Sequence, residues 1–388
     1  MITVRAGRMA LYFLKLGATG FGGPIALAGS MQRTLVEERG WIAPDEYVEG
    51  LALAQLAPGP LAAQLAMYLG YIRGGLVGAT LSGVAFILPS FLMVWALAAA
   101  YVRYGGLWWV HAVFYGIGAA VIGIMVRSVM KLGRLTLARD PLSWMIAALL
   151  AITTAVTGRE SVALFVLAGV APLVVRALSN HKGHKGKRAV ARVFPFVSFV
   201  SSVVVQLIAS TPALACEVSL GSIGWFFARA GAFVFGSGLA VVPFLYGGVV
   251  VERHWLTDRQ FLDAVAVAMI TPGPVVITVA FIGYLVRGPA GMVAAAAGIF
   301  LPVYLVVVIA APWFRRYHAR AAVRTFVGGV TAAATGAIAG AAVLLGMRAI
   351  VDGWTMAMAA ATFALLWRWR VSELWLIAAA GGLGLWLR

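Results

Sequence analysis

Two cations occupy matching positions inside apolar, glycine-rich segments of the chain. Lys15 lies in the run Phe-Leu-Lys-Leu-Gly at 13–17, and Arg229 lies in the run Phe-Ala-Arg-Ala-Gly at 227–231. An ionised side chain within hydrocarbon costs about 2.5 to 3.5 kcal/mol on insertion scales, so it usually faces a cavity or a charged partner. Two such cations facing one cavity could bind a dianion. The alternative is that each side chain extends along its helix to the headgroup region.

Glycine-dense stretches follow both cations. Glycine and proline interrupt the helical hydrogen-bond ladder, and a broken helix presents free backbone N–H groups and the positive end of its dipole, which suits an anion. The alternative is close packing of neighbouring helices through small residues. The candidate anion-binding backbone positions in these stretches are Gly22, Gly23, Gly236, Ser237 and Gly238.

A Pro-Gly-Pro sequence interrupts the next apolar segment after each glycine-rich stretch. Two prolines within one span break a helix, and the break could be a hinge, a substrate cradle or both, with a site-lining break favoured over a plain kink. Gln55 and Gln64 lie near the first break, and Thr271 and Thr278 lie near the second, as hydrogen-bonding groups. The predicted substrate-lining residues are Pro58, Gly59, Pro60, Pro272, Gly273 and Pro274.

A Glu-Arg pair precedes a tryptophan in each half of the chain. Interface anchoring is the favoured interpretation, because tryptophan and local ion pairs gather where a chain leaves the membrane. A gate is the alternative for the pairs Glu38-Arg39 and Glu252-Arg253, which precede Trp41 and Trp255.

All of these motifs belong to one internal repeat. They recur in the same order at a nearly constant separation, and further rare residues stay in register with them. The additional matches are Gly70-Tyr71 with Gly283-Tyr284, Gly75 with Gly288, and Leu88-Pro89 with Leu301-Pro302. The sequence therefore predicts two homologous halves.

The composition indicates a membrane protein. Hydrophobic residues make up 62% of the chain and charged residues only 11%, far from the roughly 25% charged of a soluble domain. We expect an all-α polytopic protein with about 10–13 membrane segments, some of them broken or re-entrant, and a retained first helix rather than a signal peptide. The predicted spans are 10–32, 50–72, 75–102, 108–126, 142–158, 161–178, 193–214, 223–250, 262–286, 288–312, 325–347, 353–366 and 371–387.

The net charge of +17 is interpreted as a topology signal rather than as nucleic-acid binding. The predicted cytoplasmic side holds the amino terminus, Arg73, the 127–140 loop, Arg253, the 315–324 loop, Arg368 and Arg370. The 37–49 loop is predicted on the outside. Equivalent helices would then point in opposite directions, which predicts an inverted repeat of the kind found in secondary transporters. The halves are 1–175 and 193–388, joined by a basic cytoplasmic linker at 176–192, for which metal or anionic-lipid binding is the alternative role.

The sequence gives little support for disulfide, enzymatic or metal chemistry. The single cysteine rules out an internal disulfide, and the enzyme motifs that carry nucleophiles, phosphate loops or metal ligands are missing from the sequence. We expect neither an enzyme nor a cofactor or metal, with the lipid bilayer as partner and a homo-oligomer compatible with the sequence. The sequence places no clear Asp or Glu inside a predicted span, which argues against a built-in proton relay, and Asp263 and Glu49 at the span edges are the nearest candidates.

The Phe21-Gly22-Gly23-Pro24 run, the Pro-Gly-Pro breaks and their second-half counterparts resemble the chromate ion transporter family. The resemblance implies chromate efflux that confers resistance, across the inner membrane of a bacterium, driven by membrane potential or proton motive force. Ser237 departs from the glycine that many members carry. Transport of sulfate or another small oxyanion remains an alternative, and an intramembrane enzyme or a lipid-handling protein is the alternative from another class.

Overall fold

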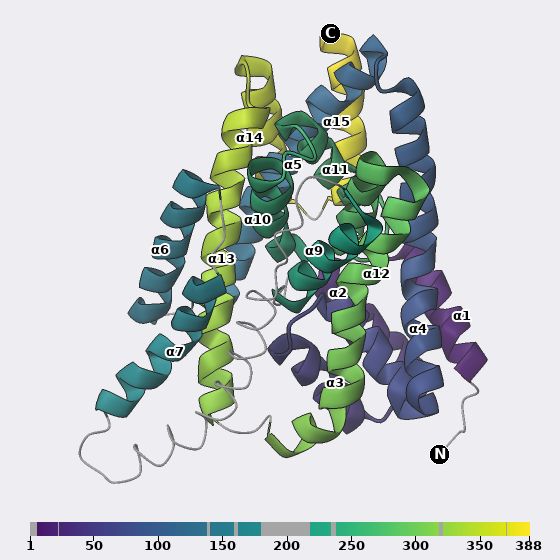
Figure 1. Cartoon of the computed structure of the whole chain (residues 1–388), viewed down its shortest axis with the longest axis vertical. Helices are drawn as coiled ribbons and strands as arrows, with labels where there is room; N and C mark the ends of the chain where they lie inside the picture. Colours follow the sequence, from purple (N-terminus) through teal and green to yellow (C-terminus); the bar gives the residue numbers. More distant parts are fainter. Residues whose placement is uncertain are drawn as a thin grey trace.

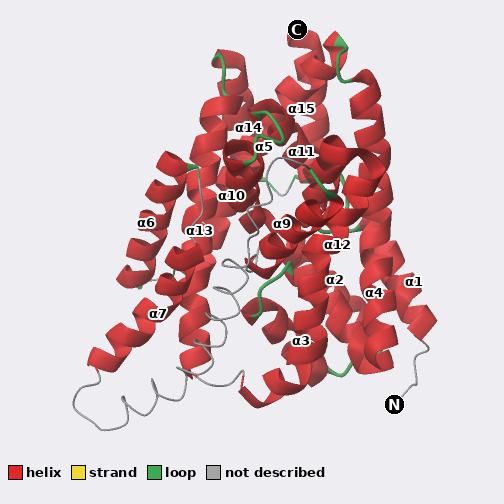
Figure 2. Cartoon of the chain, viewed as in Figure 1, coloured by secondary structure: helices red, strands yellow, loops and turns green. Residues whose placement is uncertain are grey.

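The computed structural model describes residues 6–21, 23–137, 140–158, 162–179, 218–233, 238–317, 321–369 and 371–388. Within these ranges the chain is helical and contains no sheet (Figure 2). Four helical stretches are long and apolar enough to cross a membrane, namely Leu61–Tyr104, Trp108–Thr136, Val275–Ile309 and Thr325–Ala349. The all-α polytopic prediction is confirmed.

Both halves contain the same series of α- and π-helices, to which the second half adds the short 3-10 helices η2 and η4 (Figure 1). The first half has α1 (Ala6–Thr19), α2 (Gly23–Met31), the π-helix η1 (Gln32–Glu38), α3 (Pro44–Leu56), α4 (Leu61–Tyr104), α5 (Trp108–Thr136), α6 (Pro141–Thr157) and α7 (Val162–Ser179). The second half has α9 (Leu220–Phe233), η2 (Gly238–Ala240), α10 (Val241–Tyr246), the π-helix η3 (Gly247–Glu252), α11 (Asp258–Ile270), η4 (Val275–Ile277), α12 (Thr278–Tyr317), α13 (Ala321–Ala349), α14 (Gly353–Arg368) and α15 (Glu373–Leu387).

The glycine-rich segments fold back on themselves as helical hairpins. Tyr12 of α1 donates a hydrogen bond to the carbonyl of Ser30 in α2 at 3.3 Å, so these two helices lie side by side. In the second half, Phe226 of α9 stacks on Phe244 of α10 with 5.7 Å between ring centroids. The predicted spans 10–32 and 223–250 are therefore re-entrant hairpins rather than straight crossings.

The Pro-Gly-Pro segments form a second hairpin in each half. A Cβ atom added to Gly50 of α3 would lie 2.4 Å from the Tyr68 ring in α4, so α3 and the start of α4 pack together with the break at their tip. Arg73 forms a salt bridge with Glu46 across the open end of this hairpin. Equivalent caps begin α3 and α11, where Glu46 and Gln260 accept hydrogen bonds from the backbone N–H groups of Ala43 and Thr257.

A sharp reversal divides α4 and α12 into two arms each. Gly75 has φ of 57° and Gly288 has φ of 60°, a conformation that favours glycine. The arms then approach so closely that a Cβ atom on Gly70 would lie 2.3 Å from the carbonyl oxygen of Gly78. The division of spans predicted near residues 73 and 287 therefore agrees with the structure.

The two halves are inverted relative to each other. Thr80 of α4 contacts the Tyr304 hydroxyl of α12 at 2.9 Å, and farther along α4 the Tyr101 ring contacts the Phe281 ring with centroids 5.3 Å apart. Phe281 lies on the first arm of α12 and Tyr304 on its second, and in Figure 1 the second arm of α4 rises toward the end of the molecule that holds the carboxyl terminus, whereas the second arm of α12 descends from that end. Because these helices are equivalent in the repeat, their antiparallel packing confirms the inverted arrangement.

The halves also exchange their last helices. α6 and α7 of the first half pack on α13 of the second, whereas α14 and α15 of the second half pack on α5 of the first. Small residues allow this packing, since a Cβ atom on Gly116 would lie 1.8 Å from the Ala380 carbonyl oxygen and one on Gly336 would lie 2.1 Å from that of Ala147. Neither half is a separate body.

Part of the predicted topology is wrong. Arg73 donates to the Trp41 carbonyl oxygen at 2.7 Å, so the 37–49 loop and Arg73 lie at the same end of the molecule. Inversion of the repeat then assigns Arg253, the counterpart of Arg39, to the opposite end. The loop charges gave the wrong side because the prediction treated each hairpin segment as a full crossing. Both hairpins of the first half return to the side of the membrane from which they enter.

Two further boundaries differ from the predictions. α5 continues to Thr136, so Arg127, Lys131 and Arg134 lie on this helix rather than in a loop. α7 extends to Ser179, which makes the first residues of the predicted linker helical. The rest of the linker and the predicted span 193–214 lie outside the described residues.

Candidate functional site

The tip of the second Pro-Gly-Pro hairpin meets the break between α1 and α2 of the other half. The backbone N–H of Gly273 donates to the carbonyl oxygen of Gly20 at 2.9 Å. Gly273 has φ of 93°, and a Cβ atom there would lie 2.1 Å from Ser90 Oγ. Glycine is required at this position both by the conformation and by the close approach.

Each long crossing arm contacts the Pro-Gly-Pro tip of the other half. Ser90 of α4 is buried and donates from Oγ to the carbonyl oxygen of Pro272 at 2.6 Å. Val303 is its repeat counterpart in α12, and its Cγ1 atom would lie 3.1 Å from a Cβ atom on Gly59. The two tips are thus held in equivalent positions by different chemistry.

Polar atoms line the first tip. Gln64 is fully buried and donates from Nε2 to the carbonyl oxygen of Pro58 at 2.5 Å. Its Oε1 atom has no hydrogen-bond partner among the described residues. A buried amide with an unused oxygen is unusual away from functional sites.

A helical element also begins directly after each tip. The first donor within the helix that follows Pro60 is the N–H of Gln64, bonded to the Pro60 carbonyl at 3.0 Å, so the three preceding N–H groups are free of intrahelical bonds. After Pro274, η4 begins at Val275, and a Cβ atom on Gly238 would lie 3.3 Å from Val275 Cβ. Free N–H groups and positive dipole ends suit an anion.

The two predicted cations lie in different surroundings. Lys15 is exposed on α1, whereas Arg229 of α9 is half-buried. The Nε atom of Arg229 is buried without a hydrogen-bond partner among the described residues, and its charge interacts with that of Arg253. Their convergence on one ligand stays a prediction.

The two Glu-Arg pairs end the π-helices η1 and η3. The Arg39 guanidinium lies over the Trp41 ring at 4.5 Å, and that of Arg253 lies over the Phe226 ring at 4.6 Å and the Trp255 ring at 5.2 Å. Such cation–π contacts agree with interface anchoring. A gate formed by Glu38, Arg39, Glu252 and Arg253 stays a prediction.

Some site residues were missed or cannot be placed. Gly22, Gly236 and Ser237 lie outside the described residues, whereas Gly23 and Gly238 begin α2 and η2. Ser90 was not predicted, although it directly follows the repeated Leu88-Pro89 motif. Within the described ranges, no group of three or more histidine, cysteine or acidic residues could hold a metal ion.

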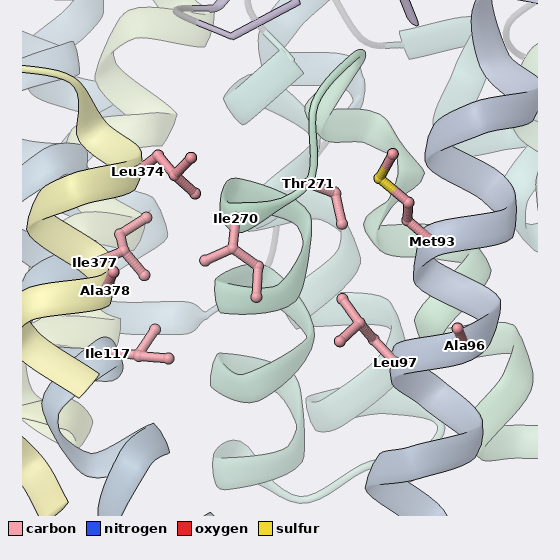
Figure 3. Close-up of a pocket in the computed structure, with 9 residues that line it drawn as sticks. All are labelled: Met93, Ala96, Leu97, Ile117, Ile270, Thr271, Leu374, Ile377 and Ala378. Carbon is pink, nitrogen blue, oxygen red and sulfur yellow. The ribbon is translucent and has the colours of Figure 1, made fainter. Parts of the chain in front are cut away.

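A cavity of about 530 Å³ lies beside the second tip, between α4, α5, α11 and α15 (Figure 3). Thr271, next to Pro272, is the one polar residue among those drawn around it. Apolar walls do not compensate for the lost hydration of an oxyanion. The hairpin tips are therefore better suited to an anion than this cavity.

Inverted halves with re-entrant hairpins, and a Pro-Gly-Pro tip that bonds to the helix break of the other half at Gly20, define a polytopic membrane transporter. The family comparison gives a more specific identity. The Chromate transporter family model matches residues 7–173 and 221–385, so the chain belongs to the chromate transporter family. This is a family of transporters and not of enzymes.

Relatives cover nearly the whole chain. It is 54% identical over 387 residues to a chromate transport protein of Cupriavidus metallidurans, covering 97% of this chain and 92% of the relative. It is also 54% identical over 345 residues to a probable chromate transport protein of Synechococcus elongatus, covering 89% and 86%. A chromate transport protein of Pseudomonas aeruginosa is 31% identical over 389 residues, covering 97% and 90%. No solved structure matches the chain.

Proposed function

We propose that this protein exports chromate from the bacterial cytoplasm across the inner membrane and thereby confers chromate resistance. The observation that carries the proposal is the meeting of the re-entrant tips, where Gly273 bonds to Gly20 and Ser90 to Pro272, in a chain closely similar to chromate transport proteins. The substrate would bind the free N–H groups of the helix starts, with Lys15 and Arg229 supplying positive charge.

Membrane potential is sufficient to drive this export. Moving one charge across 100 mV is worth about 2.3 kcal/mol, so a dianion leaving a cell with a potential of ~150 mV gains roughly 7 kcal/mol. Such a gain sustains a concentration ratio of about five decades. Proton motive force could supply more through an exchanged proton.

The charge distribution favours a cytoplasmic amino terminus. The second arm of α4 leads away from Arg73 and α5 returns, so α5 finishes at the end of the molecule that carries Arg73, with Lys131 and Arg134 in its last two turns. Positive residues gather on the cytoplasmic side of membrane proteins. The opposite end, with Trp255, would then face the periplasm.

The decisive experiment measures chromate uptake into everted membrane vesicles. Lys15→Gln and Arg229→Gln should each lower uptake strongly at equal protein level, because a buried dianion loses a partner charge. Arg103→Gln is the matched control, since Arg103 lies over the Tyr104 ring at the end of α4, 5.7 Å from its centroid, away from the tips. Full uptake by both variants would remove the two cations from the mechanism.

Sulfate is the second candidate substrate. It is a tetrahedral dianion like chromate, and backbone N–H groups bind both in the same way. An excess of sulfate in the same vesicles should compete with chromate if the site accepts tetrahedral dianions in general. Chromate uptake that is unaffected by a large excess of sulfate would make the site chromate-selective.

A further inference from the structure

One buried carboxyl group has no role in the anion site as described. Asp263 lies on α11, the outer arm of the second Pro-Gly-Pro hairpin, and only 5% of its surface is exposed. The Tyr101 hydroxyl of α4 donates a hydrogen bond to its Oδ2 atom at 2.7 Å. The bond therefore joins the crossing arm of the first half to a hairpin of the second.

The surroundings favour a carboxyl that exchanges a proton. Most of its neighbours on α11 are apolar and buried, including Leu262, Ala264, Val265 and Val267, and an ionised carboxylate in such surroundings is expensive unless it is paired. Tyr101 supplies one neutral donor. Arg259, one turn earlier on α11, acts on Asp263 through its charge but is itself exposed, so solvent screens it.

The first turn of α11, which precedes Asp263, lies near the surface of the protein. Arg259 also interacts with the charge of His111 at the start of α5, and Asp258 pairs with Arg348 of α13 at 3.0 Å. Among the described neighbours of α11, Tyr101 and Arg259 are the groups that act on the Asp263 carboxyl directly. Asp263 lies roughly one and a half helical turns from the start of α11, with the exposed Arg259 between, and roughly two turns from the hairpin tip at Thr271.

The acids at this position of the repeat differ in their surroundings between the two halves. Glu49 occupies the equivalent position of α3, but it is only half-buried, and the residue equivalent to Tyr101 is Phe314. The acid of the second half is buried and accepts from a tyrosine hydroxyl, whereas the equivalent acid of the first half is half-buried and a phenylalanine replaces the tyrosine in the sequence. An exchanged proton needs one such site per transport cycle.

We propose that Asp263 is the proton-binding group that couples chromate export to proton entry. Its carboxylate binds one proton from the side at which α11 begins and releases that proton to the other side when the hairpin changes position. The inference rests on the proposed function, because it names the ion exchanged for the anion.

The test uses purified full-length protein in proteoliposomes, with the membrane potential clamped to zero by valinomycin and equal potassium. Exchange of radiolabelled chromate across the membrane reports binding and movement without net driving force. Chromate flux driven by a pH gradient, together with the proton movement seen by an internal pH dye, reports coupling. Absence of chromate exchange by the unmodified protein would contradict the proposed function and not the coupling role alone.

Asp263→Asn should retain chromate exchange but lose both pH-driven flux and chromate-dependent proton movement. Glu49→Gln, the matched control, should keep all three. Tyr101→Phe should keep coupling, since the carboxyl remains. Proton movement by Asp263→Asn equal to that of the unmodified protein would overturn the proposal. Loss of exchange in both Asp263→Asn and Asp263→Glu would assign the residue a structural role and also overturn it.

Discussion

At the scale of single residues, the centre of this transporter depends on backbone atoms held by a few buried side chains. The Pro272 carbonyl accepts from Ser90, and the Pro58 carbonyl accepts from Gln64. These bonds supply hydrogen-bond donors to carbonyl oxygens that have no helical N–H partner at the proline breaks. The side chains of Ser90 and Gln64 hold the hairpin tips in position, and the tips supply the backbone N–H groups for the substrate.

Ser90→Ala should destabilise the protein by about 1 to 3 kcal/mol, because it leaves a buried carbonyl without its donor. It should also lower chromate transport through displacement of the second tip. Ser82→Ala is the matched control on the same helix, since Ser82 Oγ is buried without a partner among the described residues, and it should be neutral. Thermal unfolding in detergent measures the stability of the two variants. Equal unfolding temperatures for the two variants would contradict the role given to Ser90.

At the scale of elements, the re-entrant hairpins depend on tight reversals as much as on their tips. The reversal at Gly75 brings the two arms of α4 together, and the one at Gly288 does the same for α12. Nothing lies within 4 Å of a Cβ atom at either glycine. The requirement there is conformational and not steric.

Gly75→Ala should therefore cost about 1 to 3 kcal/mol through backbone strain alone. Gly118→Ala on α5 is the control, because a Cβ atom there also meets nothing within 4 Å and alanine is preferred by about 1 kcal/mol inside a helix. The two substitutions should shift the unfolding temperature in opposite directions. A stabilising Gly75→Ala would mean that the reversal tolerates a side chain.

The sequence predicted these elements better than it predicted their placement. The repeated Pro-Gly-Pro motifs revealed both breaks, because proline acts on the local backbone, and the gaps between predicted spans fell at both reversals. The side of the 37–49 loop was predicted wrongly, since charge alone does not reveal that Arg73 bonds back to Trp41. Ser90 and Tyr101 were missed because their partners lie far away in the sequence, in the other half.

At the scale of the whole molecule, each inverted half packs the last two helices of the other half against one of its own long helices. α5 of the first half is covered by α14 and α15, and α13 of the second is covered by α6 and α7. The contacts at Gly116 and Gly336 are too close for any side chain. Cooperative behaviour of the two halves follows from this exchange.

Half-molecules cut between Arg188 and Ala189 should fail to accumulate when expressed singly, because each would expose a helix face meant for the other half. Expressed together, they should assemble and restore part of the chromate transport. Co-purification through a tag on one half, followed by vesicle uptake, measures this outcome. A stable, monodisperse first half on its own would contradict the mutual dependence.

The exchanged helices also bear on how the protein is made. The ribosome completes α5 long before it reaches α14 and α15, so α5 must remain in the membrane with one packing face unfilled until the end of synthesis. Contacts between such distant segments slow folding and leave intermediates open to misassembly and degradation. A stop codon within the last helix would thus damage the earliest-made half most, and quality-control proteases would meet the defect on α5 rather than at the truncated end.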